Sequence, residues 1–214
     1  MRNPFGFLIK KRVEKKPVRS PLPQDRFLEM ISAFETAELK ARATDFSGGL
    51  ALEVAPHLKP LASLLKGPRF LVSIGTTEGA TLQSREDLLP FLNTSLELVL
   101  LRSYQGRKHL SALLRETSRV LKRQGQLILV DLHPFSPMVQ EEFQNQPATE
   151  EGIPPGFERY FRFLGSGGWI VEGVKESFFD NNSKKFFKDD LPEKFEEFRR
   201  KPCLILLVLR KGGG

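Results

Sequence analysis

The sequence predicts an α/β fold in which a doubly wound, mostly parallel sheet has helices on both faces. Short, wholly apolar runs recur along the chain, and such strands are typical of parallel sheets that are buried on both faces. Amphipathic helical patterns alternate with these runs. With 214 residues, of which 40% are apolar, the chain is long enough to bury one substantial core.

The first half of the chain contains a long helical pattern and two strands. Apolar side chains recur at three- and four-residue steps over 27–41, which predicts a helix that Asp25 caps. Apolar runs at 50–54 and 70–74 predict strands, and a helical pattern at 58–65 lies between them. A strand, a helix and a second strand in this order favour parallel pairing.

The second half continues with a strand at 96–101 and the most regular helical pattern of the chain, at 110–121. Two basic residues and a glycine close this helix, as is typical of helix C-termini. A strand at 126–130 follows at once, and two more strands are expected at 169–178 and 203–209. The alternation therefore extends through most of the chain.

Residues 1–23 are expected to form a flexible, basic, proline-containing tail, and residues 24–214 a single α/β domain. The first 24 residues hold seven of the 33 Lys and Arg but one of the 26 Asp and Glu, so the remainder is close to neutral. This distribution argues against a basic nucleic-acid-binding face on the fold itself. The tail is expected either to contact an anionic surface (membrane, nucleic acid or acidic protein) or to remain a solvated arm.

The composition points to a cytoplasmic protein without an integral membrane segment. No stretch approaches 18 uninterrupted apolar residues, and the start has no secretory signal pattern. The single cysteine, Cys203, excludes an internal disulfide and a CxxC metal site. The three histidines lie far apart in sequence with no clustered carboxylate, so we expect no metal site.

Three segments, in the right order, resemble a known family. Residues 89–99 (LPFLNTSLELV) resemble an "LPF…S-F-D-x-V" pattern, residues 116–129 (ETSRVLKRQGQLIL) resemble "E-x-x-R-V-L-K-P-G-G-x-L", and Gly168-Trp169-Ile170-Val171 resembles "G-F-x-V". The pattern is that of class I S-adenosylmethionine-dependent methyltransferases of the type 11-like group, over roughly 48–210. The resemblance implies a Rossmann-like, seven-stranded sheet whose last strand is antiparallel, and S-adenosylmethionine as the cofactor.

The resemblance also implies cofactor-binding positions, and here the sequence departs from the family. The residues at or nearest these positions are Glu53, Ala55, Thr76, Glu78, Glu86 and Leu88. The family has a glycine-rich turn after the first strand, where the backbone approaches the cofactor closely. This chain has APHLKP at 55–60, without glycine and with two prolines that lack N–H donors. The ribose-binding acid falls at Thr76, with Glu78 as a substitute, and the adenine-binding acid at Arg85, with Glu86 nearby. The motif is degenerate, so weak or absent cofactor binding is expected.

Candidate catalytic residues follow from the edge at which ligands bind in open α/β sheets, beyond the carboxyl ends of the strands. His57 follows the first strand, Tyr104 the fourth and His133 the fifth. Two histidines and a tyrosine at one edge could provide a general base and an orienting group for a small acceptor. The alternative is that they are ordinary polar loop residues.

Two functions therefore remain open. The first is a divergent methyltransferase with weakened or lost catalysis, acting on an unknown acceptor. The second is a non-catalytic pseudo-methyltransferase that serves as a binding or assembly module for an unknown small molecule or protein. The charged, phenylalanine-rich insertion near 179–201 is expected to form either a lid over the carboxyl edge or a partner-binding surface.

Overall fold

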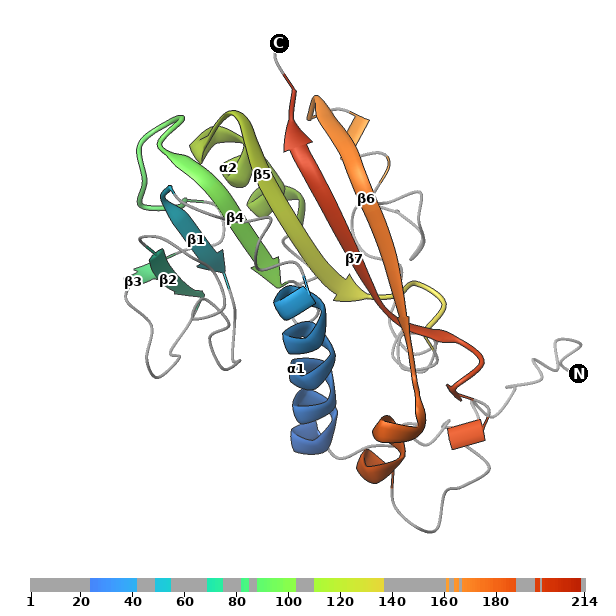
Figure 1. The fold of residues 1–214 in the computed structure, drawn as a ribbon. Coiled ribbons are helices and arrows are strands. Elements are labelled where there is room, and N and C mark those ends of the chain that lie inside the picture. The colour runs from blue at the N-terminus through green and yellow to red at the C-terminus, as the bar shows by residue number, and fades with distance from the viewer. Residues whose placement is uncertain are drawn as a thin grey trace, which may run out of the picture.

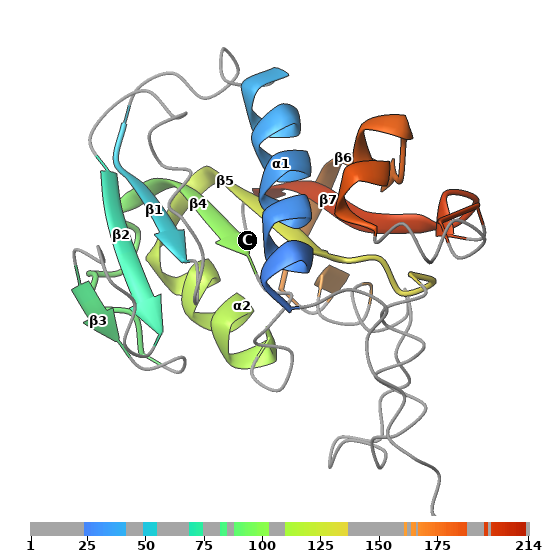
Figure 2. The ribbon, with the colours of Figure 1, turned by 90° about the horizontal axis from the view of Figure 1, so that it is seen from below.

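The computed structural model describes residues 24–41, 49–54, 69–74, 82–84, 88–102, 110–136, 161, 164–165, 167–187, 195–196 and 198–212. These residues form a seven-stranded sheet with the order β3-β2-β1-β4-β5-β7-β6 (Figure 1). The helices α1 (Gln24–Ala41) and α2 (Leu110–Val120) lie on opposite faces of it (Figure 2). The predicted α/β fold class is confirmed.

The strands are β1 (Ala51–Val54), β2 (Arg69–Ile74), β3 (Leu82–Ser84), β4 (Leu96–Arg102), β5 (Leu121–Leu132), β6 (Trp169–Phe178) and β7 (Pro202–Lys211). The five strands from β3 to β5 in the sheet order pair in parallel. Strand β7 is antiparallel to both of its neighbours, β5 and β6, as the resemblance implied for the last strand. The sequence patterns did not predict β3, because its three residues, LQS, include a single apolar side chain.

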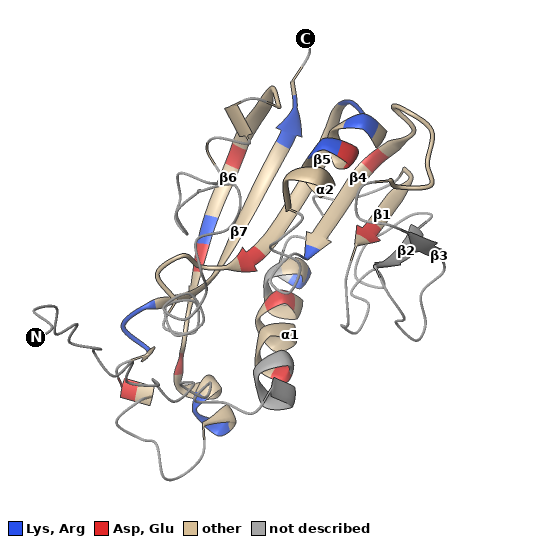
Figure 3. Ribbon diagram, turned by 180° about the vertical axis from the view of Figure 1, so that it is seen from behind, with Lys and Arg blue, Asp and Glu red and all other residues tan. Residues whose placement is uncertain are grey.

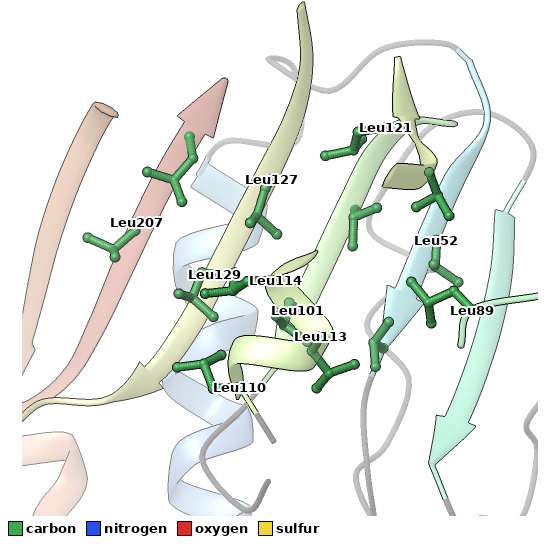
Figure 4. Close-up of a cluster of buried hydrophobic side chains, with 14 of the residues drawn as sticks. Leu52, Leu89, Leu101, Leu110, Leu113, Leu114, Leu121, Leu127, Leu129 and Leu207 are labelled. Carbon is green, nitrogen blue, oxygen red and sulfur yellow. The ribbon is translucent and has the colours of Figure 1, made fainter. Parts of the chain in front are cut away.

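Each face of the sheet contributes alternate residues of the strands to a separate apolar layer. The leucines of α2 pack over those of β1, β4 and β5 on one face (Figure 4). The other layer contains Leu39 of α1 with Leu100, Ile128 and Leu206 of the sheet. Burying one such side chain contributes roughly 1.5–3 kcal/mol. No helix of the described residues is long and apolar enough to cross a membrane.

The described part of the phenylalanine-rich insertion packs as a core and not as an open surface. This aromatic cluster consists of Phe179, Phe187, Phe195, Phe198 and the partly buried Phe186, which pack with Met30, Ile31 and Phe34 of α1 and with the buried Cys203. Ring centroids of Phe187 and Phe195 are 5.2 Å apart in an edge-on arrangement. The 3-10 helix η3 (Asn181–Phe186) begins with a capping box between Asp180 and Ser183. This described part of the insertion therefore packs against α1 at the end of the sheet, whereas Phe178, the last residue of β6, is exposed.

Candidate functional site

The carboxyl ends of β1, β4 and β5 lie at one edge of the sheet, where α/β proteins bind ligands. Most of β4, β5 and β7 is uncharged in Figure 3, and charged residues lie near the strand ends. Three charged residues at this edge are buried: Glu53 of β1, Arg102 of β4 and Asp131 of β5. Glu53 and Arg102, which contact each other, form the centre of the candidate site.

Arg102 joins two carboxylates that come from different elements, and we refer to Arg102, Glu35 and Glu53 as the ion cluster. Its Nη1 donates to Oε1 of Glu53 at 3.0 Å. Its Nε lies 3.2 and 3.1 Å from the two carboxylate oxygens of Glu35 on α1, and Nη2 also donates to Glu35. None of the three side chains has solvent-exposed surface. The planar guanidinium thus serves both acids at once, in directions that its rigid fork fixes.

The local structure explains why these three residues meet. Glu53 is in register with Leu100 of the neighbouring strand, and Arg102 follows Leu100 by two residues on the same face of the sheet. Glu35 lies four residues from both Ile31 and Leu39, which are buried, so it is on the helix face that covers this side. A buried pair of this kind is costly to break, by about 3–5 kcal/mol, because the remaining charge has no counterion.

His133 lies just beyond β5, and both of its ring nitrogens are engaged. Its Nε2 is 2.9 Å from Oε1 of Glu176 on β6, and its Nδ1 accepts from the backbone N–H of Phe135 at 3.1 Å. Burial lowers the pKa of His133, although the bond with Glu176 acts in the opposite direction. The ring is therefore neutral near pH 7, with its proton on Nε2. These contacts are those of a residue that holds a turn, and they give no support to a role as general base, which stays a prediction.

The loop 88–95, which contains the predicted cofactor contact Leu88, is held by Arg119 and Glu116 of α2. Arg119 donates to the carbonyl oxygens of Leu89 and Phe91, each at 2.8 Å. It also pairs with Glu116, whose carboxylate accepts the N–H of Leu89 at 2.9 Å. Leu88 itself is 62% exposed, whereas Leu89 is buried in the core. The "E-x-x-R" segment and the "LPF" segment are thus bound to each other.

The remaining predicted site residues, His57, Tyr104, Ala55, Thr76, Glu78 and Glu86, lie outside the described residues. Of the predicted set, the structure therefore places Glu53, Leu88 and His133. Sequence reasoning did not identify Glu35, although a carboxylate on the apolar face of a helix was a usable signal. No group of His, Cys, Asp or Glu within the described residues could hold a metal ion.

Comparison with known proteins supports the fold. No family model and no curated protein match the sequence. An S-adenosylmethionine-dependent methyltransferase from Mesorhizobium loti is 14% identical, with 85% of this chain and 99% of that chain covered and a TM-score of 0.54. A protein from Listeria monocytogenes assigned to the same activity is 16% identical, with 86% and 100% covered and a TM-score of 0.60. Geranyl diphosphate C-methyltransferase from Streptomyces coelicolor, solved with S-adenosyl-L-homocysteine, is 12% identical, with 92% and 82% covered and a TM-score of 0.57. The fold is therefore methyltransferase-like.

Proposed function

We propose that this chain is a divergent methyltransferase-fold protein in which binding of S-adenosylmethionine, and with it methyl transfer, is weakened or lost. The observation that supports this most directly is the buried ion pair of Glu53 with Arg102. Glu53 matches an acidic cofactor-binding position of the family, yet its carboxylate is already paired with a guanidinium. In this arrangement Glu53 does not fit the role that the resemblance implies.

The strength of the ion pair determines how far the affinity for the cofactor should fall. A ligand that needs the Glu53 carboxylate must first separate it from Arg102, at a cost of roughly 3–5 kcal/mol. Since 1.4 kcal/mol corresponds to a factor of ten, affinity should fall by about two to three and a half orders of magnitude. A micromolar site would become a millimolar one. The absence of glycine at 55–60 acts in the same direction, because two prolines there lack N–H donors.

Isothermal titration calorimetry with S-adenosylmethionine and S-adenosylhomocysteine tests the proposal. We expect no detectable heat with either ligand at millimolar concentration. A micromolar dissociation constant that weakens on Glu53→Ala would contradict the proposal and indicate an active enzyme. Glu29→Ala, which removes an exposed carboxylate of α1, is the matched control.

A second candidate function is that of a non-catalytic assembly module, which the outer strand β6 favours. Among the strands that the structure describes, β6 has a neighbour on one side only, and Ile170, Val171, Val174 and Phe178 are exposed. Exposed apolar edge strands tend to associate. Sedimentation velocity over a range of concentrations should then show self-association that Val174→Lys removes. The same change at the exposed Leu92, outside the strand, should have no effect; a chain that remains monomeric throughout would exclude this form of assembly.

A further inference from the structure

We infer that Arg102 is an autoinhibitory contact, which α1 positions through Glu35 and which withholds Glu53 from a cationic nucleoside ligand. This inference rests on the proposed function and concerns the regulation of the same site. It assigns a role to two residues, Glu35 and Arg102, that the resemblance leaves without one.

Glu35 and Glu53 contact different nitrogen atoms of Arg102. Glu35 binds the guanidinium through both Nε and Nη2, so it fixes the plane and the direction of the group. Nη1 then faces Glu53 and donates a hydrogen bond to its carboxylate. Glu35 lies 67 residues from Arg102 in sequence and belongs to a helix, so the contact ties α1 to the end of β4. Arg102 is thus held mainly by α1, while the residue it blocks is on β1.

Burial makes this contact effective as a block. All three side chains are withdrawn from solvent, where opposite charges attract more strongly than at the surface because water does not screen them. A soluble cation must therefore compete with a guanidinium that is already in place and already desolvated. S-adenosylmethionine carries positive charge on its sulfur and its amino group. To bind the Glu53 carboxylate, such a ligand must displace Arg102.

The charges of the ion cluster suggest a balanced variant. Two carboxylates and one guanidinium give a formal charge of −1. Replacing both Glu35 by Gln and Arg102 by Met removes one charge of each sign, so the cluster stays at −1 and Glu53 becomes its only carboxylate. Arg102→Met alone would leave two buried carboxylates without the guanidinium, which is strongly destabilising. The double variant leaves one unpaired buried carboxylate instead of two, so it releases Glu53 at a smaller loss of stability than Arg102→Met alone.

The experiment measures the affinity of the Glu35→Gln/Arg102→Met variant for S-adenosylmethionine and S-adenosylhomocysteine by calorimetry and by ligand-induced shift of Tm. We expect affinity at least tenfold above that of the wild-type chain, and loss of this gain when Glu53→Gln is added. Glu196→Gln/Arg199→Met makes the same charge change at an exposed pair and should leave affinity unchanged. If the double variant lacks a cooperative thermal transition, Glu35→Gln/Arg102→Gln takes its place, because glutamine keeps an N–H donor for Glu53.

The outcomes distinguish the inference from the proposed function. A folded double variant that binds no better than a non-binding wild-type chain overturns the inference and leaves the proposed function intact. A gain that survives Glu53→Gln also overturns it, since the block would then not act on Glu53. Micromolar binding by the wild-type chain contradicts the proposed function and, with it, the inhibition.

Discussion

Arg119, a partly exposed residue of α2, should contribute strongly to stability, because its side chain bonds to the loop 88–95. Arg119→Ala removes donors to the carbonyls of Leu89 and Phe91 and to Oδ1 of Asn93, each at 2.8 Å, together with the ion pair to Glu116. Hydrogen bonds from a charged donor contribute about 1.5–3 kcal/mol each when buried. The Arg119 side chain is 29% exposed, so water replaces part of this, and about 1 kcal/mol per bond is the appropriate value. We expect the free energy of unfolding to fall by about 3 kcal/mol.

Equilibrium urea unfolding followed by far-ultraviolet circular dichroism measures this difference. Arg119→Lys should lose more than half as much stability as Arg119→Ala, because an ammonium cannot reproduce the planar fork that reaches several acceptors. Arg199→Ala is the matched control, since Arg199 also pairs with a glutamate three residues earlier but both side chains are about half exposed. Its effect should stay within about 0.5 kcal/mol. A loss below about 1 kcal/mol for Arg119→Ala, or one equal to that of Arg199→Ala, would refute the reasoning.

Three further predictions concern the backbone, the response to acid and the tail. Thr94 has a left-handed backbone (φ 51°), which is strained for a β-branched residue, so Thr94→Gly should raise the free energy of unfolding by about 1 kcal/mol; a decrease would contradict this. The hydrogen bond from Lys122 lowers the pKa of Glu97 in the folded state. The carboxylate therefore stabilises the fold at a pH above its ordinary pKa, and this stabilisation is lost as the pH falls through the lower pKa of the folded state. Glu97→Gln should therefore flatten the loss of Tm between roughly pH 5 and pH 3, and an unchanged profile would count against it. Deleting residues 1–22 should abolish salt-sensitive binding to heparin, used as an anionic surface, with Tm nearly unchanged; binding that persists, or that salt does not affect, would argue against the tail as the anion-binding segment.

Most of the regular structure was predictable because it depends on local periodicity. The strand expected at 169–178 has those bounds in the structure, and the helix expected at 110–121 ends one residue earlier. Strand β5 begins at Leu121, five residues before the predicted strand, since Leu121 pairs with Leu96 across a register irregularity. The segment LKRQG has no strand pattern of its own. The extension of β5 to Leu121 therefore becomes visible only through its pairing with β4.

Contacts between distant segments account for what the sequence did not reveal. The predicted end of α2 contained the basic residues Lys122 and Arg123, but Lys122 pairs with Glu97. The carbonyl oxygens of Ser118 and Leu121 instead receive bonds from Lys211, which lies 93 and 90 residues away. In the same way, Arg102 closes an apolar strand, and its partners are visible only once α1 and β1 are packed beside it.

Two of the three segments that carry the family resemblance contact each other, and this limits what the resemblance means. In this chain the "LPF" loop accepts and donates hydrogen bonds with a guanidinium and a carboxylate of α2. These two matching segments therefore have a packing role here, which does not depend on methyl transfer. The position that would report chemistry is Glu53, and there the acid is present but bound to Arg102. A chain can keep the contacts between the loop 88–95 and α2 while Glu53 no longer binds a cofactor. The affinity for the nucleoside ligand, and not the quality of the fold match, therefore decides between enzyme and pseudoenzyme.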